Sequence, residues 1–374
     1  MNSRSKKWLL VAAALAVLGY LVYRCSGSLG LGRFSGAKLW LAIKGVNPLL
    51  LSAALLLIYG CYALRALRWQ VFQRNIGKSN FLDIYKMTLA GFAAVNILSR
   101  VGEPIRPLLL ARKAKHPVAD IFGIWVLERL FDTASFAIIL AIGLLVFSPR
   151  VEIGQMKSTI ATAKVGGGLL ALGVVVAITL LVFLRLHGTS LIQSRMTRWI
   201  LSSGWRSSAA KMILGFIRGI QTVKSWSDLS VAVFYSGIHW FLVLIVYVLV
   251  CKSFGGSLAG LRVSDCTMLL GLTLVGSIIQ LPAVGGGFQT AAFIVLTKLL
   301  GVETEAATAA ALVLWLVAFV ACSIAGIPLL IREGVSLGKL RELAEHEKEE
   351  LDDIAAHGSA GPSVERGGKG EKPE

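Results

Sequence analysis

The sequence predicts an all-α polytopic membrane protein, with about six full spans and two re-entrant helical hairpins in an inverted-topology repeat. Three observations support this class: an apolar composition, two apolar segments broken by turns, and an uneven distribution of basic residues over the loops. Of the 374 residues, 55% are hydrophobic and 16% are charged, and the mean hydropathy is +0.72. A helix needs roughly 20 apolar residues to cross about 30 Å of hydrocarbon, and several stretches reach that length.

Six stretches are predicted to be full spans. They cover residues 8–23, 48–67, 118–147, 166–184, 230–251 and 304–331. The basic residues before the first stretch are also typical of a signal peptide. No small-residue cleavage site follows that stretch, so we predict an uncleaved first span.

Two further apolar segments contain a turn. Residues 81–110 are interrupted at VGEPIRP, and residues 264–301 are interrupted at LPAVGGG. If the N-terminus is cytoplasmic and both segments are re-entrant hairpins, the cytoplasmic segments carry about twice as many Lys and Arg residues as the outer ones, as the positive-inside rule requires. The alternative is that residues 81–99 and 264–281 are full spans, which would place the hairpin tips at the membrane surfaces.

The spans and hairpins form two units of opposite orientation, 48–147 and 230–331, within a membrane domain of residues 1–331. Inverted repeats of this kind are common among transporters. Residues 332–374 are predicted to be a charged cytoplasmic tail, disordered after about residue 357. We therefore expect a multi-pass protein of a bacterial or archaeal plasma membrane with both termini in the cytoplasm. The net charge of +17 indicates basic loops and contacts with anionic lipids, and gives no indication of nucleic acid binding.

The turn of the first hairpin has the composition of an anion site. Glu103 and Arg106 each precede a proline, which disfavours a regular helix through residues 103–106. Pro107 suits the first position of a new helix, whose free N–H groups would face the turn. Arg100 and Arg106 lie close by in the sequence, and arginine can grip a phosphate with two parallel hydrogen bonds. The alternative is a basic cytoplasmic loop that obeys the positive-inside rule.

The turn of the second hairpin also breaks an apolar segment before a new helix, but it carries no charged residue. Gly285, Gly286 and Gly287 permit positive φ angles and close approach of the backbone. A helix is predicted to begin near Phe288, with Gln289 beside it. The N-terminus of this helix would face the same cavity from the opposite side. The alternative is a flexible loop.

Three charged residues occupy the middle of the segment 118–147. Glu128 and Asp132 are four residues apart and share a helical face, and Arg129 lies between them. Charges at this depth are costly, so they should face the bundle interior and be paired. They either complete the anion site, with the acids balancing the arginines or carrying a proton, or form a structural ion-pair network with the first hairpin, and both can hold. His239, in another apolar run, is predicted to be a hydrogen-bonded packing residue.

The chain resembles the flippase-like membrane domain of bacterial lysylphosphatidylglycerol synthases and its stand-alone relatives. The resemblance covers about residues 48–331 and rests on SRVGEPIRPLLL, on the ER..D pattern of the charged triad, and on LPAVGGGFQTAAF followed by LLGV. It implies movement of lipids or lipid-linked head groups between leaflets. The third motif usually reads more like PGGxGxxE, and here Gln289 lies at or near the usual acid. The sequence lacks the cytosolic aminoacyl-transfer domain of the full synthases, so no aminoacylation of lipid is expected.

Together these observations predict a lipid flippase or related transporter for an anionic, phosphate-bearing head group. Arg100, Arg106 and Arg129 would bind the head group, while the three nearby acids would hold the arginines. The alternative is a non-transporting scaffold or regulator, with an enzyme of lipid or cell-envelope glycan synthesis as its partner. The sequence contains no nucleophile–base pair, metal-ligand spacing or Walker-type loop, so we expect neither catalysis nor a cofactor.

Overall fold

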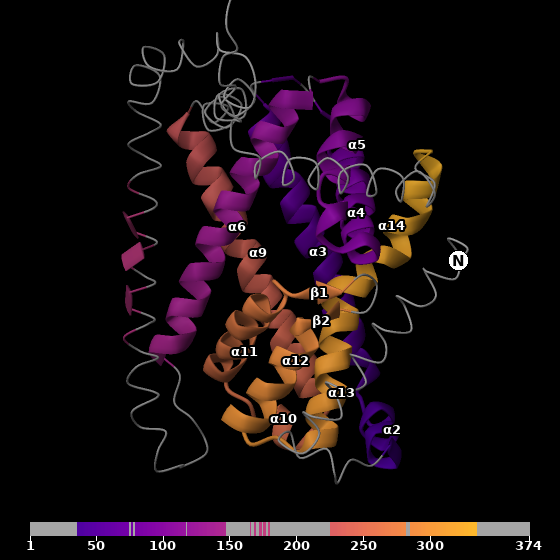
Figure 1. Cartoon of the computed structure of the whole chain (residues 1–374), viewed down its shortest axis with the longest axis vertical. Helices are drawn as coiled ribbons and strands as arrows, with labels where there is room; N and C mark the ends of the chain where they lie inside the picture. Colours follow the sequence, from indigo (N-terminus) through magenta and orange to yellow (C-terminus); the bar gives the residue numbers. More distant parts are fainter. Residues whose placement is uncertain are drawn as a thin grey trace, which may run out of the picture.

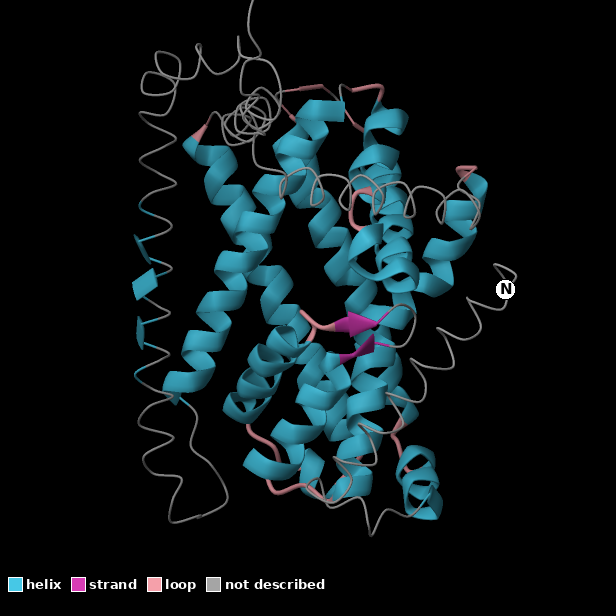
Figure 2. Ribbon diagram, in the orientation of Figure 1, coloured by secondary structure: helices cyan, strands magenta, loops and turns pink. Residues whose placement is uncertain are grey.

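The computed structural model describes residues 36–74, 76–77, 79–116, 118–146, 225–281 and 285–334, and scattered positions between 165 and 179. The predicted span 8–23, most of the predicted span 166–184, and the predicted tail beyond residue 334 lie outside the described residues. The described part of the chain is almost entirely helical, with one very short pair of strands near its middle (Figure 2).

The elements divide into an N-terminal and a C-terminal group. The first contains α2 (Gly36–Lys44), α3 (Pro48–Gln73), α4 (Phe81–Leu98), the 3-10 turn η2 (Ser99–Gly102), α5 (Ile105–Ala114) and α6 (Val118–Val146). The second contains α9 (Trp226–Ser253), α10 (Gly256–Ala259), α11 (Val263–Gly276), the strands β1 (Gln280–Leu281) and β2 (Gly285–Gly286), α12 (Gly287–Ile294), the π-helix η3 (Val295–Leu299), α13 (Thr304–Trp315), the π-helix η4 (Leu316–Val320) and α14 (Ala321–Arg332).

Among the described residues, five helices are long and apolar enough to cross a membrane. They are Pro48–Gln73, Phe81–Leu98, Asp120–Val146, Trp226–Ser253 and Thr304–Arg332. Four of them match predicted full spans, which confirms the polytopic membrane class. The fifth is α4, the first arm of the first broken segment, and its 18 residues also leave a full span possible there. The corresponding arm of the second segment, α11, has only 14 residues, fewer than the roughly 20 that a span needs.

The start of α3 follows from its sequence. The side-chain oxygen of Asn47 accepts hydrogen bonds from the backbone N–H groups of Leu49 and Leu50, at 3.0 and 3.3 Å. Pro48 occupies the first helical position, where its missing N–H has no intrahelical partner to lose. These two residues explain why the helix begins here.

The end of α3 differs from the prediction. The predicted span 48–67 continues as one helix to Gln73. Arg65 and Arg68 therefore lie on this helix, about one to two turns before its end. This shift places two additional cations inside the bundle.

The predicted break in the first hairpin is present. α4 ends at Leu98, and η2 and a turn at Glu103 and Pro104 separate it from α5. The break starts at Ser99, whose φ of 60° and ψ of −142° lie in a region that strains any residue with a side chain. The chain thus reverses at this turn, and α5 returns alongside α4.

The start of α5 also differs from the prediction. The helix begins at Ile105 and not at Pro107, which lies in its first turn. Proline is tolerated there because the first N–H groups of a helix have no intrahelical partner. Arg106 is therefore helical, contrary to the expected break through residues 103–106, and its side chain is fixed by the first turn of α5.

The two hairpins lie at opposite ends of the molecule. Figure 1 shows α4 and α5 beside α3 in the upper half, and α11 and α12 in the lower half. The turn of the second hairpin is the antiparallel β1–β2 pair, in which Gln280 lies opposite Gly286 and Leu281 opposite Gly285. β1 contacts η2, so the two turns meet near the middle of the long axis.

Close helix packing fixes the position of the first hairpin. α4 packs along α14, where a Cβ at Gly326 would meet the carbonyl oxygen of Leu89 and the Cβ of Ala93. Asn96 on α4 donates a hydrogen bond to the Ser323 hydroxyl at 3.1 Å. Small residues and interhelical hydrogen bonds are the main means by which helices associate in a membrane. α4 is therefore fixed in position beside the site described below.

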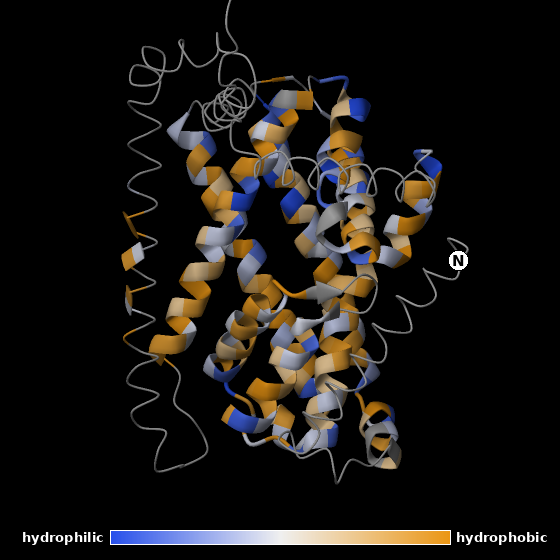
Figure 3. Cartoon of the chain, in the orientation of Figure 1, coloured by the Kyte–Doolittle hydropathy of each residue, from blue (hydrophilic) through white to orange (hydrophobic). Residues whose placement is uncertain are grey.

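The hydropathy of the chain shows which helices carry hydrophilic residues inside the bundle. The helices are mostly apolar, but α3 and α6 carry hydrophilic segments within the upper half of the molecule (Figure 3). Large apolar side chains such as Leu56 and Ile324 are 74% and 72% exposed, as expected of surfaces that face lipid. The hydrophilic segments face inward, and they form the candidate site.

Candidate functional site

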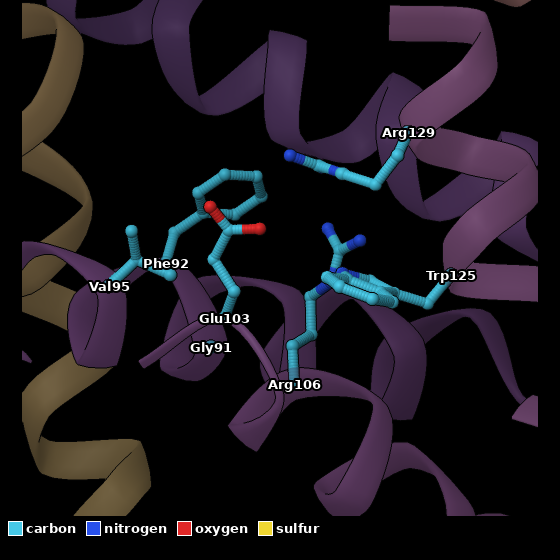
Figure 4. Close-up of a pocket in the computed structure, with 7 residues that line it drawn as sticks. All are labelled: Gly91, Phe92, Val95, Glu103, Arg106, Trp125 and Arg129. Atoms are coloured by element: carbon cyan, nitrogen blue, oxygen red, sulfur yellow. The ribbon is translucent and has the colours of Figure 1, made fainter. Parts of the chain in front are cut away.

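A small pocket lies between α4, the turn that follows η2, α5 and α6. Its lining residues are Gly91, Phe92, Val95, Glu103, Arg106, Trp125 and Arg129. Figure 4 shows Arg129 and Arg106 reaching into it from different helices, with the Glu103 carboxylate on the side of Phe92. The pocket therefore combines two guanidinium groups, one carboxylate and an apolar wall.

Arg106 is the most enclosed charge of the pocket. Its side chain is 4% exposed and pairs with Glu128 on α6. Its guanidinium carbon lies 4.9 Å from the ring centre of Trp69 and 5.1 Å from that of Phe92, so aromatic rings pack around it. Its Nη1 atom is buried and has no hydrogen-bond partner among the described residues. This nitrogen is a donor available to a bound anion.

Arg106 owes its position to a glycine on α4. A Cβ at Gly91 would overlap the Cβ and Cγ atoms of Arg106. Only a residue without a side chain lets the first turn of α5 approach α4 this closely. Gly91 is thus the residue that admits Arg106 to the pocket.

Two carboxylates on α6 neutralise part of the positive charge behind the pocket. Glu128 is fully buried, and Asp132 lies one turn further along α6 with its side chain 12% exposed. Arg65 of α3 contacts Glu128 at 3.4 Å and Asp132 at 2.6 Å. Arg68 of α3 contacts the same two acids at 3.2 and 2.7 Å, and also donates to the Ser236 hydroxyl at 2.9 Å.

The cluster is completed from α6 itself. Arg129 contacts Asp132 at 3.2 Å and Glu128 at 3.6 Å, and its buried Nε atom has no hydrogen-bond partner among the described residues. Four arginines therefore share two carboxylates, which leaves an excess of positive charge inside a membrane bundle. Such an excess is costly unless an anion completes it.

Glu103 lines the pocket beside Arg106 and Arg129. Its predicted role in holding arginines stays a prediction, because the side chain of Arg100 lies outside the described atoms. Glu128 and Asp132 pair with the arginines that the structure describes.

Arg65 and Arg68 were missed by the sequence analysis. They follow an apolar run, a position typical of residues at the membrane surface, and the sequence analysis gave them no role in the site. A signal for them does exist: two buried acids on α6 need more cations than Arg129 and Arg106 provide. Arginines three residues apart at the end of the preceding long apolar segment are the natural source.

The glycine turn lies away from the lining of this pocket. Gly286 has φ of 102°, and its N–H donates to the side-chain oxygen of Gln289 at 2.6 Å. A Cβ at Gly287 would meet the carbonyl oxygens of Gly276 and Ile279. These residues, with Gly285 in β2, shape the second hairpin, while none of the four lines the pocket.

Arg100 and His239 are not among the described residues that line this pocket. Arg100 lies in η2, and its side chain is outside the described atoms. His239 is buried on α9, and its Nδ1 atom lies 3.1 Å from the carbonyl oxygen of Cys61, in agreement with the predicted packing role. In the described part of the chain, no group of three or more His, Cys, Asp or Glu side chains is arranged to hold a metal ion.

A comparison with known protein families identifies the family of this chain. The family described as Lysylphosphatidylglycerol synthase TM region matches residues 8–326. The chain belongs to this family. No curated protein and no solved structure matches the sequence. As a member of the lysylphosphatidylglycerol synthase transmembrane family, the protein is a membrane domain related to lipid metabolism, and its buried arginine cluster is the candidate site of that role.

Proposed function

We propose that this protein moves a lipid with an anionic, phosphate-bearing head group between the leaflets of the membrane. The observation that carries the proposal is the pocket with two arginines, Arg106 and Arg129, that each keep a buried nitrogen without a partner in the described chain. Guanidinium groups bind phosphate oxygens with strong, directional hydrogen bonds.

The enclosed part of the pocket is small, about 40 Å³, so it fits at most a compact group such as a phosphate. The rest of the head group and the acyl chains would stay outside it. Phe92, Val95 and Trp125 supply the apolar part of the wall.

Helix packing supports an inverted repeat, which we propose consists of residues 48–147 and 230–331. α3 and α9 are antiparallel, since the Asn47 N–H donates to the Ser253 carbonyl at 2.7 Å. α4 pairs with α14, and α11 pairs with α6. If the two units are exchanged, α3 and α9 change places and their pair is unchanged. The α4–α14 pair then takes the place of the α11–α6 pair, and the reverse. Such a two-fold relation, with two broken segments that meet at their turns, is typical of alternating-access transporters.

We propose that the α5 end of the molecule faces the cytoplasm and that both hairpins are re-entrant, in a plasma membrane with cytoplasmic termini. Arg112, Lys113 and Lys115 at the end of α5 support this orientation. It is tested by labelling single cysteines in intact cells. Lys113→Cys should react only with a reagent that enters the cytoplasm, and Ser257→Cys on α10 with one that does not. Reaction in the reverse pattern would invert the proposed topology.

Transport is tested in proteoliposomes with fluorescent phosphatidylglycerol, from the fraction that an external reductant bleaches with time. The wild-type protein should speed exchange between leaflets relative to empty liposomes. Arg106→Gln and Arg129→Gln should each lower the rate by about tenfold or more, which corresponds to about 1.4 kcal/mol. Arg112→Gln, exposed on the same helix as Arg106, is the matched control and should transport as the wild type does.

Wild-type rates in both arginine variants would overturn the proposal. We further propose that the chain performs no catalysis itself. If the purified protein moves no lipid but co-purifies in a fixed ratio with an enzyme of lipid or envelope glycan synthesis, the function is that of a scaffold or regulator and not of a transporter.

A further inference from the structure

The short helix α2 exposes a mainly apolar stripe. It packs against α13 in the lower part of the molecule, whereas α5 lies in the upper part (Figure 1). Ala37, Trp40, Leu41 and Lys44 are three or four residues apart and share one face of the helix. All four are exposed, and the side chains of Trp40 and Leu41 are 60% and 65% exposed. A helix whose outer face lies in water carries polar residues on that face, so this stripe points to a different neighbour.

The place of α2 in the chain puts the stripe at a membrane surface. The spanning helix α3 starts at Pro48, shortly after α2 ends at Lys44. The N–H of Asn47, just before α3, donates to the carbonyl oxygen of Ser253 at the end of α9, at 2.7 Å. One spanning helix therefore begins at the level where another ends. With nine residues, α2 is about 14 Å long and too short to cross the bilayer itself.

The polar part of this region is basic. The Nζ atom of Lys44 lies 5.7 Å from the ring centre of Trp40, within the range of a cation–π contact. Lys252, next to the Ser253 carbonyl that holds Asn47, is also exposed. α2 contains no acidic residue. Tryptophan is enriched where the hydrocarbon meets the head groups, and lysine lays its apolar stem along the hydrocarbon while its ammonium group stays at the surface.

We infer that α2 is an interfacial helix that binds the anionic lipid surface of the bilayer. Trp40 and Leu41 lie at the boundary of the acyl chains, and Lys44 contacts the phosphates. The inference goes beyond the proposed function, because this site is distant from the arginine pocket and holds surface lipids in place of moving them. Since α2 packs against α13, the bound surface also fixes the start of the last span relative to the bilayer.

The test uses a bimane fluorophore on Leu41→Cys in lipid nanodiscs. Cys25 is replaced by serine, and the four cysteines that the structure describes are buried and stay unlabelled. Phosphatidylglycerol or phosphatidylcholine with a nitroxide near the head group serves as quencher. Both should quench the fluorophore, and phosphatidylglycerol should do so at a lower lipid fraction.

The charge of Lys44 accounts for that preference. Lys44→Gln should lower the preference for phosphatidylglycerol by about fivefold, which corresponds to about 1 kcal/mol for one basic residue near the surface. Arg112→Gln is the matched control, because Arg112 is an exposed cation at the end of α5, and the preference should stay unchanged.

Iodide in the aqueous phase separates the other possible neighbours of α2. Quenching by iodide and not by lipid would place α2 in water and overturn the inference. Protection from both quenchers would show that protein covers the stripe, either residues 8–23 or a second copy of the chain, and would also overturn it. Equal quenching by the two lipids, or an unchanged preference in Lys44→Gln, would contradict binding to an anionic surface. Failure of lipid exchange in proteoliposomes bears on the proposed function alone, because none of these measurements depends on transport.

Discussion

Arg68 on α3 and Glu128 on α6 form an ion pair at 3.2 Å in which the two side chains are only 1% and 0% exposed. The pair joins two spanning helices at the depth of the pocket, and Arg106 from the hairpin contacts the same carboxylate. Moving two charged groups out of water is costly, so a buried ion pair is held only by the attraction between its charges and by hydrogen bonds. Glu128 is therefore the central anion of the cluster, and it positions the arginines that face the pocket.

Replacing Glu128 by glutamine should destabilise the protein strongly. The change removes one of the two carboxylates that Arg68 contacts and the one carboxylate that Arg106 contacts in the described chain, and such uncompensated buried charges cost about 3–5 kcal/mol. The measurement is the thermal unfolding midpoint of the purified protein in detergent. Glu333→Gln is the control, because Glu333 pairs with Lys113 at the surface and such pairs contribute at most about 1 kcal/mol. Equal midpoints for the two variants would show that the buried cluster does not stabilise the fold.

A methyl group at Gly91 should impair anion binding. Gly91→Ala forces Arg106 away from α4, because the new Cβ would overlap its Cβ and Cγ atoms. We expect the affinity for glycerol phosphate, measured by calorimetry in detergent, to fall by about tenfold, the equivalent of about 1.4 kcal/mol. Gly60→Ala in α3, where a Cβ meets nothing within 4 Å, should bind normally and gain about 0.5–1 kcal/mol of helix stability. Equal affinities in both variants would contradict the role assigned to Gly91.

Local sequence signals predicted the parts of the site that depend on local chemistry. Two X–Pro pairs predicted a break through residues 103–106, and a break is present although the new helix begins two residues earlier than expected and includes Arg106. Glu128 and Asp132 were predicted to face inward and to be paired, because buried charges at this depth need partners. Both carboxylates are paired with several arginines.

Those local signals do not predict which residues of different helices lie close together in the fold. Arg65 and Arg68 follow an apolar run, where basic residues typically mark the membrane surface, and only the position of α6 shows that they are buried partners of its acids. The glycine run was expected to line the same cavity. Gly286 and Gly287 serve backbone geometry instead, through a positive φ and a close approach to Gly276, and sequence spacing does not distinguish the two uses.

The contact between α4 and α14 should be sensitive to a single methyl group. Gly326→Ala places a Cβ against the carbonyl oxygen of Leu89, so the two helices must separate. Overpacking of this kind costs about 1–3 kcal/mol, and separation should also weaken the hydrogen bond between Asn96 and Ser323. A lower unfolding midpoint in detergent is the expected result. Gly237→Ala on α9, which has open space around it, should leave the midpoint unchanged or raise it; a similar loss in both variants would contradict the close packing.

The turn of the second hairpin should need an oxygen at position 289, and not a charge. The side-chain oxygen of Gln289 accepts the Gly286 N–H at 2.6 Å and so caps the first turn of α12. Gln289→Glu keeps that acceptor and should retain both the unfolding midpoint and the rate of lipid exchange. Gln289→Leu removes it and should lower stability by about 1–2 kcal/mol, the usual cost of a lost helix cap. If Gln289→Glu instead changes the rate of exchange while the midpoint stays constant, the residue acts on transport through its charge and the capping role is insufficient to explain it.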